Sequence, residues 1–129
     1  MSVDLISFYS CLCDRTRLRI LNLLAKGPLC VCHVQTILGD SQVKISKHLA
    51  YLKQHGLVEV TREANWRIYR LPAKPSAALR SNLACLQDCV HEEPVFRRDL
   101  AALKALQATI EADGPACCSP RLVRAESRR

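Results

Sequence analysis

The sequence has few aromatic residues and no long apolar run. Only 5% of its 129 residues are Phe, Trp or Tyr, so a core built from its 49% hydrophobic content must be mainly aliphatic. No apolar run approaches the roughly 20 residues that a membrane-spanning helix needs. The first residues, MSVDLISFYSC, carry Asp4 and have neither a basic start nor a cleavage site, which excludes a signal peptide. We therefore expect a cytoplasmic protein with no membrane partner.

Acidic residues are also scarce. The chain has 12 Asp and Glu against 19 Lys and Arg, which gives a formal net charge of +7 and a pI near 9.2. Such a balance favours a polyanionic partner, and nucleic acid is the first expectation. The length allows one domain, or one domain with an extension.

Cysteine, in contrast, is abundant. Eight cysteines fall into four close pairs: Cys11 and Cys13, Cys30 and Cys32, Cys85 and Cys89, and Cys117 and Cys118. In the absence of a secretory signal, closely spaced thiols more often bind metal or sense redox state than form a disulfide framework. Free cysteine is also a common buried hydrophobe. We favour that packing role for Cys11 and Cys13.

The segment 39–56, GDSQVKISKHLAYLKQHG, predicts a single helix with signals at both ends. Asp40 or Ser41 can cap its first free backbone N–H groups, and Gly56 supplies a left-handed stop. Its apolar residues recur at helical spacing: Ile45, Leu49 and Leu52. The opposite face is small, polar and basic, which suits close approach to phosphates and base edges. An ordinary basic surface helix would show the same pattern.

The rest of the chain predicts further helices and one hairpin. The helices are expected over residues 3–13, 15–26, 28–38, 76–90 and 94–112, with Pro28 in the first turn of the third. Two alternating runs, 57–63 and 67–71, predict strands joined by a tight turn. Two short helices joined by a turn describe a helix-turn-helix, and a hairpin directly after it is a wing. The predicted fold class is therefore mainly α with a β-hairpin wing, a winged helix-turn-helix.

The strongly one-sided helices at the two ends of the chain predict a larger assembly. A small helix-turn-helix cannot cover both ends, whereas a homodimer formed through the N- and C-terminal helices would. Such a dimer also fits a two-fold symmetric operator. The alternative is that the C-terminal helices fold back locally, and both can hold. We assign residues 1–92 to DNA binding and dimerisation, 93–114 to an additional helix, and 115–129 to a mobile tail that contains Cys and Arg.

Three motifs lie between residues 8 and 72. They are the opening D-x-T-R-L-x-I-L, the segment S-Q-x-x-x-S-x-H-L-x-x-L-x-x-x-G-L-V and the wing ending Y-x-L. In these motifs the chain resembles the ArsR/SmtB family of metal-sensing repressors. The resemblance implies a homodimeric winged helix that binds double-stranded operator DNA and leaves it when As(III) or Sb(III) binds. It implies a transcriptional repressor and no enzymatic activity.

The predicted DNA-binding residues lie on the segment 39–56 and on the wing. They are Ser41, Gln42, Val43, Lys44, Ser46, Lys47, His48, Arg62, Arg67 and Tyr69. Gln42 is the best candidate for a base contact, because an amide can pair with two groups of adenine in the major groove. Lys44 and Lys47 suit phosphates. A helical wheel places His48 towards the core.

The predicted inducer site depends on cysteine thiolates. The run LCVCH is similar to L-C-V-C-D-L-C of arsenic-responsive members, but Gln35 stands at the third cysteine position and His33 at the acid. Arsenite and antimonite are soft and three-coordinate and need two or three thiolates. Drawing Cys30 and Cys32 onto one ion should distort the start of the third helix. An organoarsenical, which needs only two thiols, is the alternative ligand for this pair.

A second thiolate set is possible near the C-terminus, where Cys89 or Cys85 would join two adjacent cysteines. The candidate ligands are thus Cys30, Cys32, Cys89, Cys117 and Cys118. Zinc is a less favoured ion for this site. Asp88, His91 and Glu92 lie near Cys89, but their spacing matches the family's zinc pattern poorly. A repressor that responds to thiol oxidation is a further alternative. A Cys-nucleophile enzyme has no supporting signature.

Overall fold

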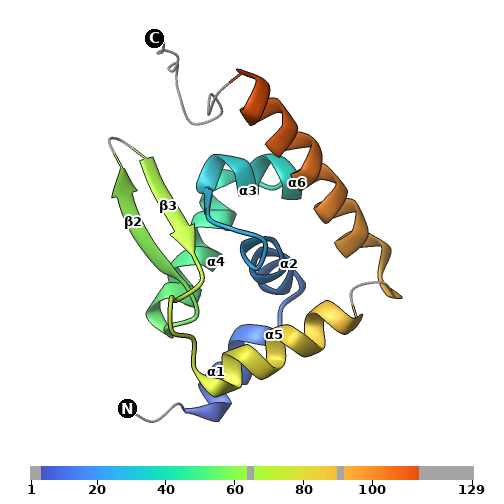
Figure 1. The fold of residues 1–129 in the computed structure, drawn as a ribbon. Coiled ribbons are helices and arrows are strands. Elements are labelled where there is room, and N and C mark those ends of the chain that lie inside the picture. Colours follow the sequence, from blue (N-terminus) through green and yellow to red (C-terminus); the bar gives the residue numbers. More distant parts are fainter. Residues whose placement is uncertain (1–3, 64–65, 90–91, 114–129) are drawn as a thin grey trace.

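A computed structural model describes residues 4–63, 66–89 and 92–113 of the chain, and Figure 1 shows its arrangement. The elements are α1 (Leu5–Leu12), α2 (Arg15–Leu24), β1 (Leu29–Cys30), α3 (Val31–Leu38), α4 (Gln42–Gln54), β2 (Glu59–Glu63), β3 (Trp66–Arg70), α5 (Ala77–Cys89) and α6 (Pro94–Asp113). The helix-turn-helix α3–α4 is followed by the β2–β3 wing. The predicted winged helix-turn-helix is therefore confirmed. Residues 115–129, predicted as a tail, lie outside the described residues.

Local signals fix the helix ends. The Ser41 side chain accepts a hydrogen bond from the Lys44 backbone N–H at 3.2 Å, so Ser41 rather than Asp40 caps α4. Asp14 caps α2 in the same way, accepting from the Arg17 N–H at 3.1 Å. Gly39, at φ 72°, closes α3 in the left-handed conformation, in which a side chain would be strained. These caps set the short turn that orients α4 against α3.

The described residues form one antiparallel sheet in the order β1-β3-β2. β2 and β3 make the hairpin, while Leu29 and Cys30 pair with Tyr69 and Ile68 of β3. The prediction that Pro28 starts a helix was therefore wrong, because the next two residues are extended and α3 begins at Val31. Their backbone groups find partners along β3 instead of within a helical turn.

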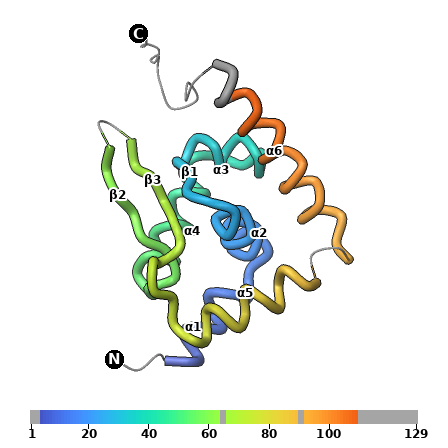
Figure 2. Tube along the Cα trace, viewed as in Figure 1, coloured from blue at the N-terminus to red at the C-terminus, as the bar shows by residue number. Residues whose placement is uncertain are grey.

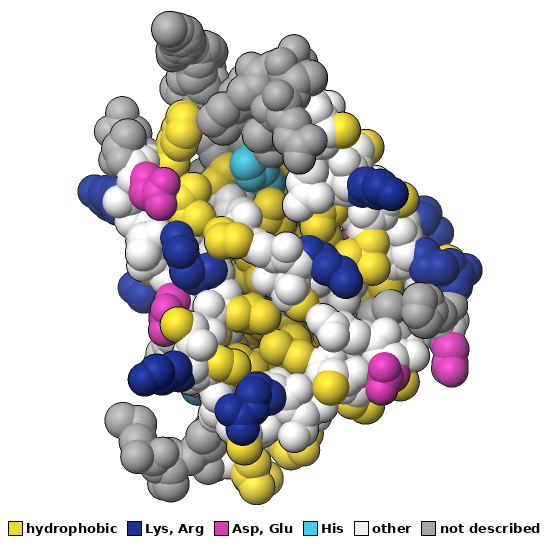
Figure 3. Space-filling view, in the orientation of Figure 1, with side chains coloured by type: hydrophobic (Ala, Val, Ile, Leu, Met, Phe, Trp, Pro, Cys, Tyr) yellow, Lys and Arg dark blue, Asp and Glu magenta, His cyan; other side chains and the backbone are white. Residues whose placement is uncertain are grey.

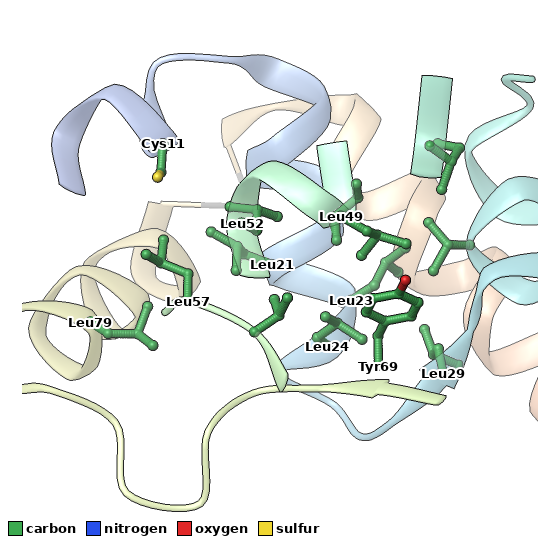
Figure 4. Packing of buried hydrophobic residues seen from close by; sticks show 14 of the residues in the cluster. Cys11, Leu21, Leu23, Leu24, Leu29, Leu49, Leu52, Leu57, Tyr69 and Leu79 are labelled. Atoms are coloured by element: carbon green, nitrogen blue, oxygen red, sulfur yellow. The ribbon is translucent and has the colours of Figure 1, made fainter. Parts of the chain in front are cut away.

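Helix α2 lies at the centre of the fold and contacts α1, α3, α4, α5 and α6. In the tube view the other helices and the hairpin surround it (Figure 2). The core is aliphatic, as the composition predicted, and contains the three apolar residues predicted for the buried face of α4, Ile45, Leu49 and Leu52. Figure 4 shows the same cluster from nearby, with Cys11 at its edge. The packing role is confirmed for buried Cys11 and wrong for Cys13, which is exposed.

The C-terminal helix α6 folds back onto the domain and contacts α2 and α3. Its own side chains Phe96 and Leu103 are buried. Arg19 of α2 donates two hydrogen bonds of 2.8 Å to the Asp99 carboxylate, one from Nε and one from Nη2. This bidentate pair, in which Asp99 is buried, fixes the position of α6. No helix among the described residues is long and apolar enough to span a bilayer.

Candidate nucleic-acid interface and thiol centre

The outer face of α4 is open, small and basic. Val43 is 64% exposed, and Gln42, Lys44 and Lys47 are exposed beside it. No acid lies on this face beyond Asp40, whose carboxylate is 3.9 Å from the Lys44 ammonium. Of the other predicted positions on this helix, Ser41 is exposed, and Ser46 and His48 are partly covered. The helix thus presents an amide, a methyl-bearing side chain and two ammonium groups to whatever approaches it.

The wing adds two guanidinium groups and a structural tyrosine. Arg62 and Arg67 are register partners across the hairpin, and both are exposed. Tyr69 is only 6% exposed and belongs to the core cluster. In Figure 4 its ring lies beside Leu23, Leu24 and Leu29. Tyr69 thus anchors the wing to the core, and a DNA contact by this residue stays a prediction.

A basic hollow of about 270 Å³ lies where the end of α4 meets the wing. It is lined by Lys53, Val60, Arg62, Arg67 and Tyr69. Three cationic side chains around one depression suit a phosphate oxygen. Lys53 was not among the predicted contacts, because its charge also suits the helix C-terminus and its proximity to the wing is a tertiary feature.

The thiol pair at the start of α3 differs from the predicted geometry. Cys30 is buried in extended backbone before the helix, and Cys32 is partly exposed in the first helical turn. The Cys30 Sγ lies 3.3 Å from Nδ1 of His33, and burial lowers the pKa of that imidazole. The pair therefore does not lie on one regular helix. One sulfur belongs to the end of β1 and the other to the first turn of α3.

A second hollow, of about 290 Å³, joins this thiol pair to the reading face. It is lined by Cys30, Val31, Cys32, Gln42, Ser46, Trp66, Arg67 and Tyr69. Three elements meet here: the start of α3, the N-terminal half of α4 and strand β3. The hollow therefore places candidate sensing and candidate reading residues around one space, which the sequence could not predict.

Of the other predicted thiols, only some lie in the residues that the structure describes. Cys85 and Cys89 are exposed free thiols on one face of α5, as their spacing predicted. The charge of Cys85, followed by burial and hydrogen bonding to Cys85, raises the pKa of the Cys89 thiol. Cys117, Cys118 and His91 lie outside the described residues. Among the described residues, three or more His, Cys, Asp or Glu side chains nowhere gather into a possible metal site.

The free thiols of the described residues are Cys11, Cys13, Cys32, Cys85 and Cys89. Cys30 takes part in further bonding and does not belong to this set. Cys32 is therefore the thiol lining the hollow that belongs to this free set. Any chemistry that also uses Cys30 requires the reduced protein.

The helix-turn-helix with its exposed basic second helix, followed by an arginine-bearing wing, is the architecture of the winged-helix class of DNA-binding domains. The family described as bacterial regulatory protein, arsR family, matches residues 14–60. A homodimeric winged helix-turn-helix DNA-binding domain from Mycobacterium bovis, described as a possible ArsR-family transcriptional regulator, is 31% identical. The match has a TM-score of 0.58 and covers 68% of this chain and 79% of that one. The chain belongs to the arsR family.

Two curated relatives match the same part of the chain. The arsenic resistance transcriptional regulator ArsR2 of Pseudomonas putida is 46% identical over 70 residues, which are 53% of this chain and 61% of that protein. The arsenical resistance operon repressor of Escherichia coli is 46% identical over 67 residues, 51% of this chain and 57% of that protein. The chain thus spans about three fifths of the length of these relatives.

Proposed function

We propose that this protein is a transcriptional repressor that binds operator DNA as a homodimer and is released when trivalent arsenic or antimony binds cysteine thiolates. One observation carries the proposal: Cys32 of the sensing end and Gln42 of the reading helix line the same hollow. The names of the curated relatives, which are arsenic resistance regulators, support the inducer class. Cytoplasmic action follows from the proposal, since the operator and the inducer are both met there.

DNA recognition rests on α4 in the major groove and the wing beside it. Exposed Gln42 suits adenine, and the exposed Val43 methyl groups suit the methyl group of thymine. Phosphate contacts fall to basic side chains on both elements: Lys44, Lys47, Lys53, Arg62 and Arg67. Ser41 and Ser46, at the N-cap and in the N-terminal half of α4, can add hydroxyl contacts. Partly covered His48 supports the helix from its inner flank.

Release follows from the position of the thiols. In the reduced protein, an ion bonded to both Cys30 and Cys32 pulls the end of β1 and the first turn of α3 together. Because α3 packs on α4, this change shifts the reading helix. The ion binds one conformation better than the other, which is the energetic requirement for a switch. Cys89, Cys117 and Cys118 remain the candidate ligands of a second site, or the source of a third thiolate.

The test measures DNA release directly. Reduced protein is bound to a fluorescent duplex selected from a random library, and anisotropy is followed during titration with arsenite or antimonite. We expect the wild-type complex to dissociate. Cys30→Ser and Cys32→Ser should bind the duplex normally and lose most of the response. Cys13→Ser, which removes an exposed thiol away from the hollow, should respond like the wild type.

Other outcomes would show which part of the proposal is wrong. A normal response in both hollow variants would place the inducer site elsewhere, and Cys89→Ser, Cys117→Ser and Cys118→Ser would then identify it. Release by peroxide, with reversal by reductant and indifference to arsenite, would favour the redox repressor instead. Retention of the duplex under all these conditions would refute the proposed switch.

A further inference from the structure

The motif D-x-T-R-L near the start of the chain contains an arginine that has no part in the proposed DNA contacts. Asp14 of this motif caps α2 by accepting a hydrogen bond from the backbone N–H of Arg17. The Arg17 side chain is half-buried and has partners on two other helices, α1 and α4. Arg17 therefore links two elements to which the proposed function gives different tasks.

The first partner of Arg17 is the C-terminal end of α1. Its Nε donates a hydrogen bond of 2.9 Å to the Cys11 carbonyl, and its Nη2 donates another of 2.9 Å to the Ser10 carbonyl. The last carbonyl groups of an α-helix lack α-helical partners, and a cation suits this end of the helix dipole. Because the guanidinium is planar, two hydrogen bonds to it also fix an orientation. Arg17 thus holds the end of α1 against α2.

The second partner of Arg17 is the aromatic ring of Tyr51 on α4. The Arg17 Cζ atom lies 4.5 Å from the centroid of this ring, which is within the range of a cation–π interaction. A flat guanidinium can also stack on an aromatic face. The Tyr51 ring packs in addition against His55, one turn further along α4, with 4.6 Å between the ring centroids. Tyr51 is therefore held between its own helix and Arg17.

The two helices that Arg17 joins carry the proposed dimer contacts and the proposed base contacts. Leu5, Ile6 and Tyr9 are exposed on α1, whereas Gln42 and Val43 are exposed at the N-terminal end of α4. Both helices pack on α2. In a symmetric dimer formed through α1, the distance and angle between the two α4 helices depend on how α4 is held relative to α1. That geometry decides which half-site spacing the dimer can match.

We propose that Arg17 is a positioning residue that sets the half-site spacing of the operator, by holding the Tyr51 ring of α4 against the end of α1. The inference rests on the proposed function, because it requires a dimer that reads two half-sites. Arg17 acts through Tyr51 and is not itself a DNA contact. Without this link each reading helix can still enter a major groove, but the two helices are no longer held at one separation and angle.

The experiment compares one duplex with a respaced version of itself. A duplex selected from a random library by the dimeric wild type is synthesised again with one base pair inserted between its half-sites. The insertion moves one half-site by about 3.4 Å and rotates it by about 34°. The ratio of the two dissociation constants, measured by anisotropy at one salt concentration, is the spacing selectivity. Loss of folded protein changes both constants equally, so a purely structural role of Arg17 would leave this ratio unchanged.

We expect the wild type to bind the respaced duplex about tenfold more weakly, which corresponds to about 1.4 kcal/mol. Arg17→Met and Tyr51→Leu should each reduce that ratio to about threefold or less, because either substitution removes the cation–π contact. The double variant should be no worse than either single one, since the two side chains form one interaction. Tyr51→Phe, which keeps the aromatic face, should preserve most of the selectivity. Arg15→Met is the matched control: it removes a guanidinium of the same helix that pairs with Glu93 instead, and it should behave like the wild type.

The same ratio can overturn the inference. Wild-type spacing selectivity in both Arg17→Met and Tyr51→Leu would show that Arg17 does not position α4, while dimeric operator binding would stand. An equal fall in Arg15→Met would also refute the inference, because loss of charge alone would explain the effect. If Arg17→Met does not fold, Tyr51→Leu and Tyr51→Phe decide the question in the same assay. A wild type that binds one half-site as a monomer would instead refute the dimeric repressor of the proposed function.

Discussion

Asn22 shows how a single residue can conflict with its surroundings. It is 1% exposed in the middle of α2, and within the described part of the chain neither amide atom has a hydrogen-bond partner. An unsatisfied buried amide costs about 1–3 kcal/mol. Asn22→Leu, which keeps the volume, should therefore raise the free energy of unfolding by about 1 kcal/mol in urea titrations. Asn22→Ala, which removes the amide without filling its space, controls for lost packing. If both substitutions lower the free energy of unfolding, the Asn22 amide has a hydrogen-bond partner after all.

His33 makes stability depend on pH in a defined direction. Burial holds its pKa below the ordinary value of 6.5. Between the folded pKa and 6.5 the unfolded chain binds more protons, so the folded state loses stability as pH falls through that window. The free energy of unfolding, measured by urea at pH values from 7.5 to 5, should fall more steeply for the wild type than for His33→Asn. Parallel curves would show that His33 titrates normally.

At the residue scale, helix ends set by adjacent residues were predictable from the sequence, whereas the burial of Tyr69 was not. Ser41 and Gly56 mark the ends of the α4 segment because caps and left-handed stops depend on a few adjacent residues. Tyr69 could not be placed in the same way, since a tyrosine flanked by polar and apolar residues fits either face of a strand. Its burial depends on Leu23 and Leu24, which are distant in sequence.

At the scale of elements, the weakest prediction was the start of α3. A strand of two residues has no periodicity, and Pro28 before it is a good first residue of a helix. Leu29 and Cys30 are extended because β3 offers them partners, and β3 is separated from them by the whole of α4. The consequence is functional, since it moves Cys30 off the helix that carries Cys32. The hollow at this junction is likewise invisible in any local pattern.

The docking of α6 depends on one buried ion pair. The sequence around Arg19 does not predict its pairing with Asp99, which lies 80 residues away. Removing one member of a buried ion pair leaves the other charge buried without a partner, which lowers the free energy of unfolding by about 3–5 kcal/mol. Asp99→Ala should therefore lower the free energy of unfolding by about 3 kcal/mol, and Arg19→Met with Asp99→Leu should recover most of the loss.

A matched pair on the surface provides the control for this experiment. Arg15 and Glu93 also form an ion pair, with side chains 64% and 49% exposed. Exposed pairs contribute about 0–1 kcal/mol because water and salt screen them. Glu93→Ala should leave urea denaturation nearly unchanged. An equal effect of the two alanine substitutions would mean that burial does not control the strength of the Arg19–Asp99 pair.

At the scale of the whole molecule, most of the exposed large apolar side chains of the described residues lie on α1, outside the reading face of α4. Leu5, Ile6 and Tyr9 are exposed on α1, which lies at the same end of the molecule as α5 (Figure 1). Figure 3 shows hydrophobic side chains at that end. The reading face of α4 carries Val43 among basic residues. A large exposed apolar patch typically marks a protein interface. This separation supports the proposed dimer, in which the N-terminal helices associate and leave both reading helices accessible.

Two glutamate substitutions can separate dimerisation from DNA reading. Ile6 is 79% exposed and Val43 is 64% exposed, so neither Ile6→Glu nor Val43→Glu should disturb the core. Ile6→Glu places a charge in the proposed interface, and it should yield a monomer by sedimentation and lower duplex affinity through the loss of one half-site. Val43→Glu should remain a dimer and lose affinity because its carboxylate faces DNA phosphates. A dimeric Ile6→Glu would exclude α1 from the interface, and unchanged duplex binding by Val43→Glu would exclude the outer face of α4 from recognition.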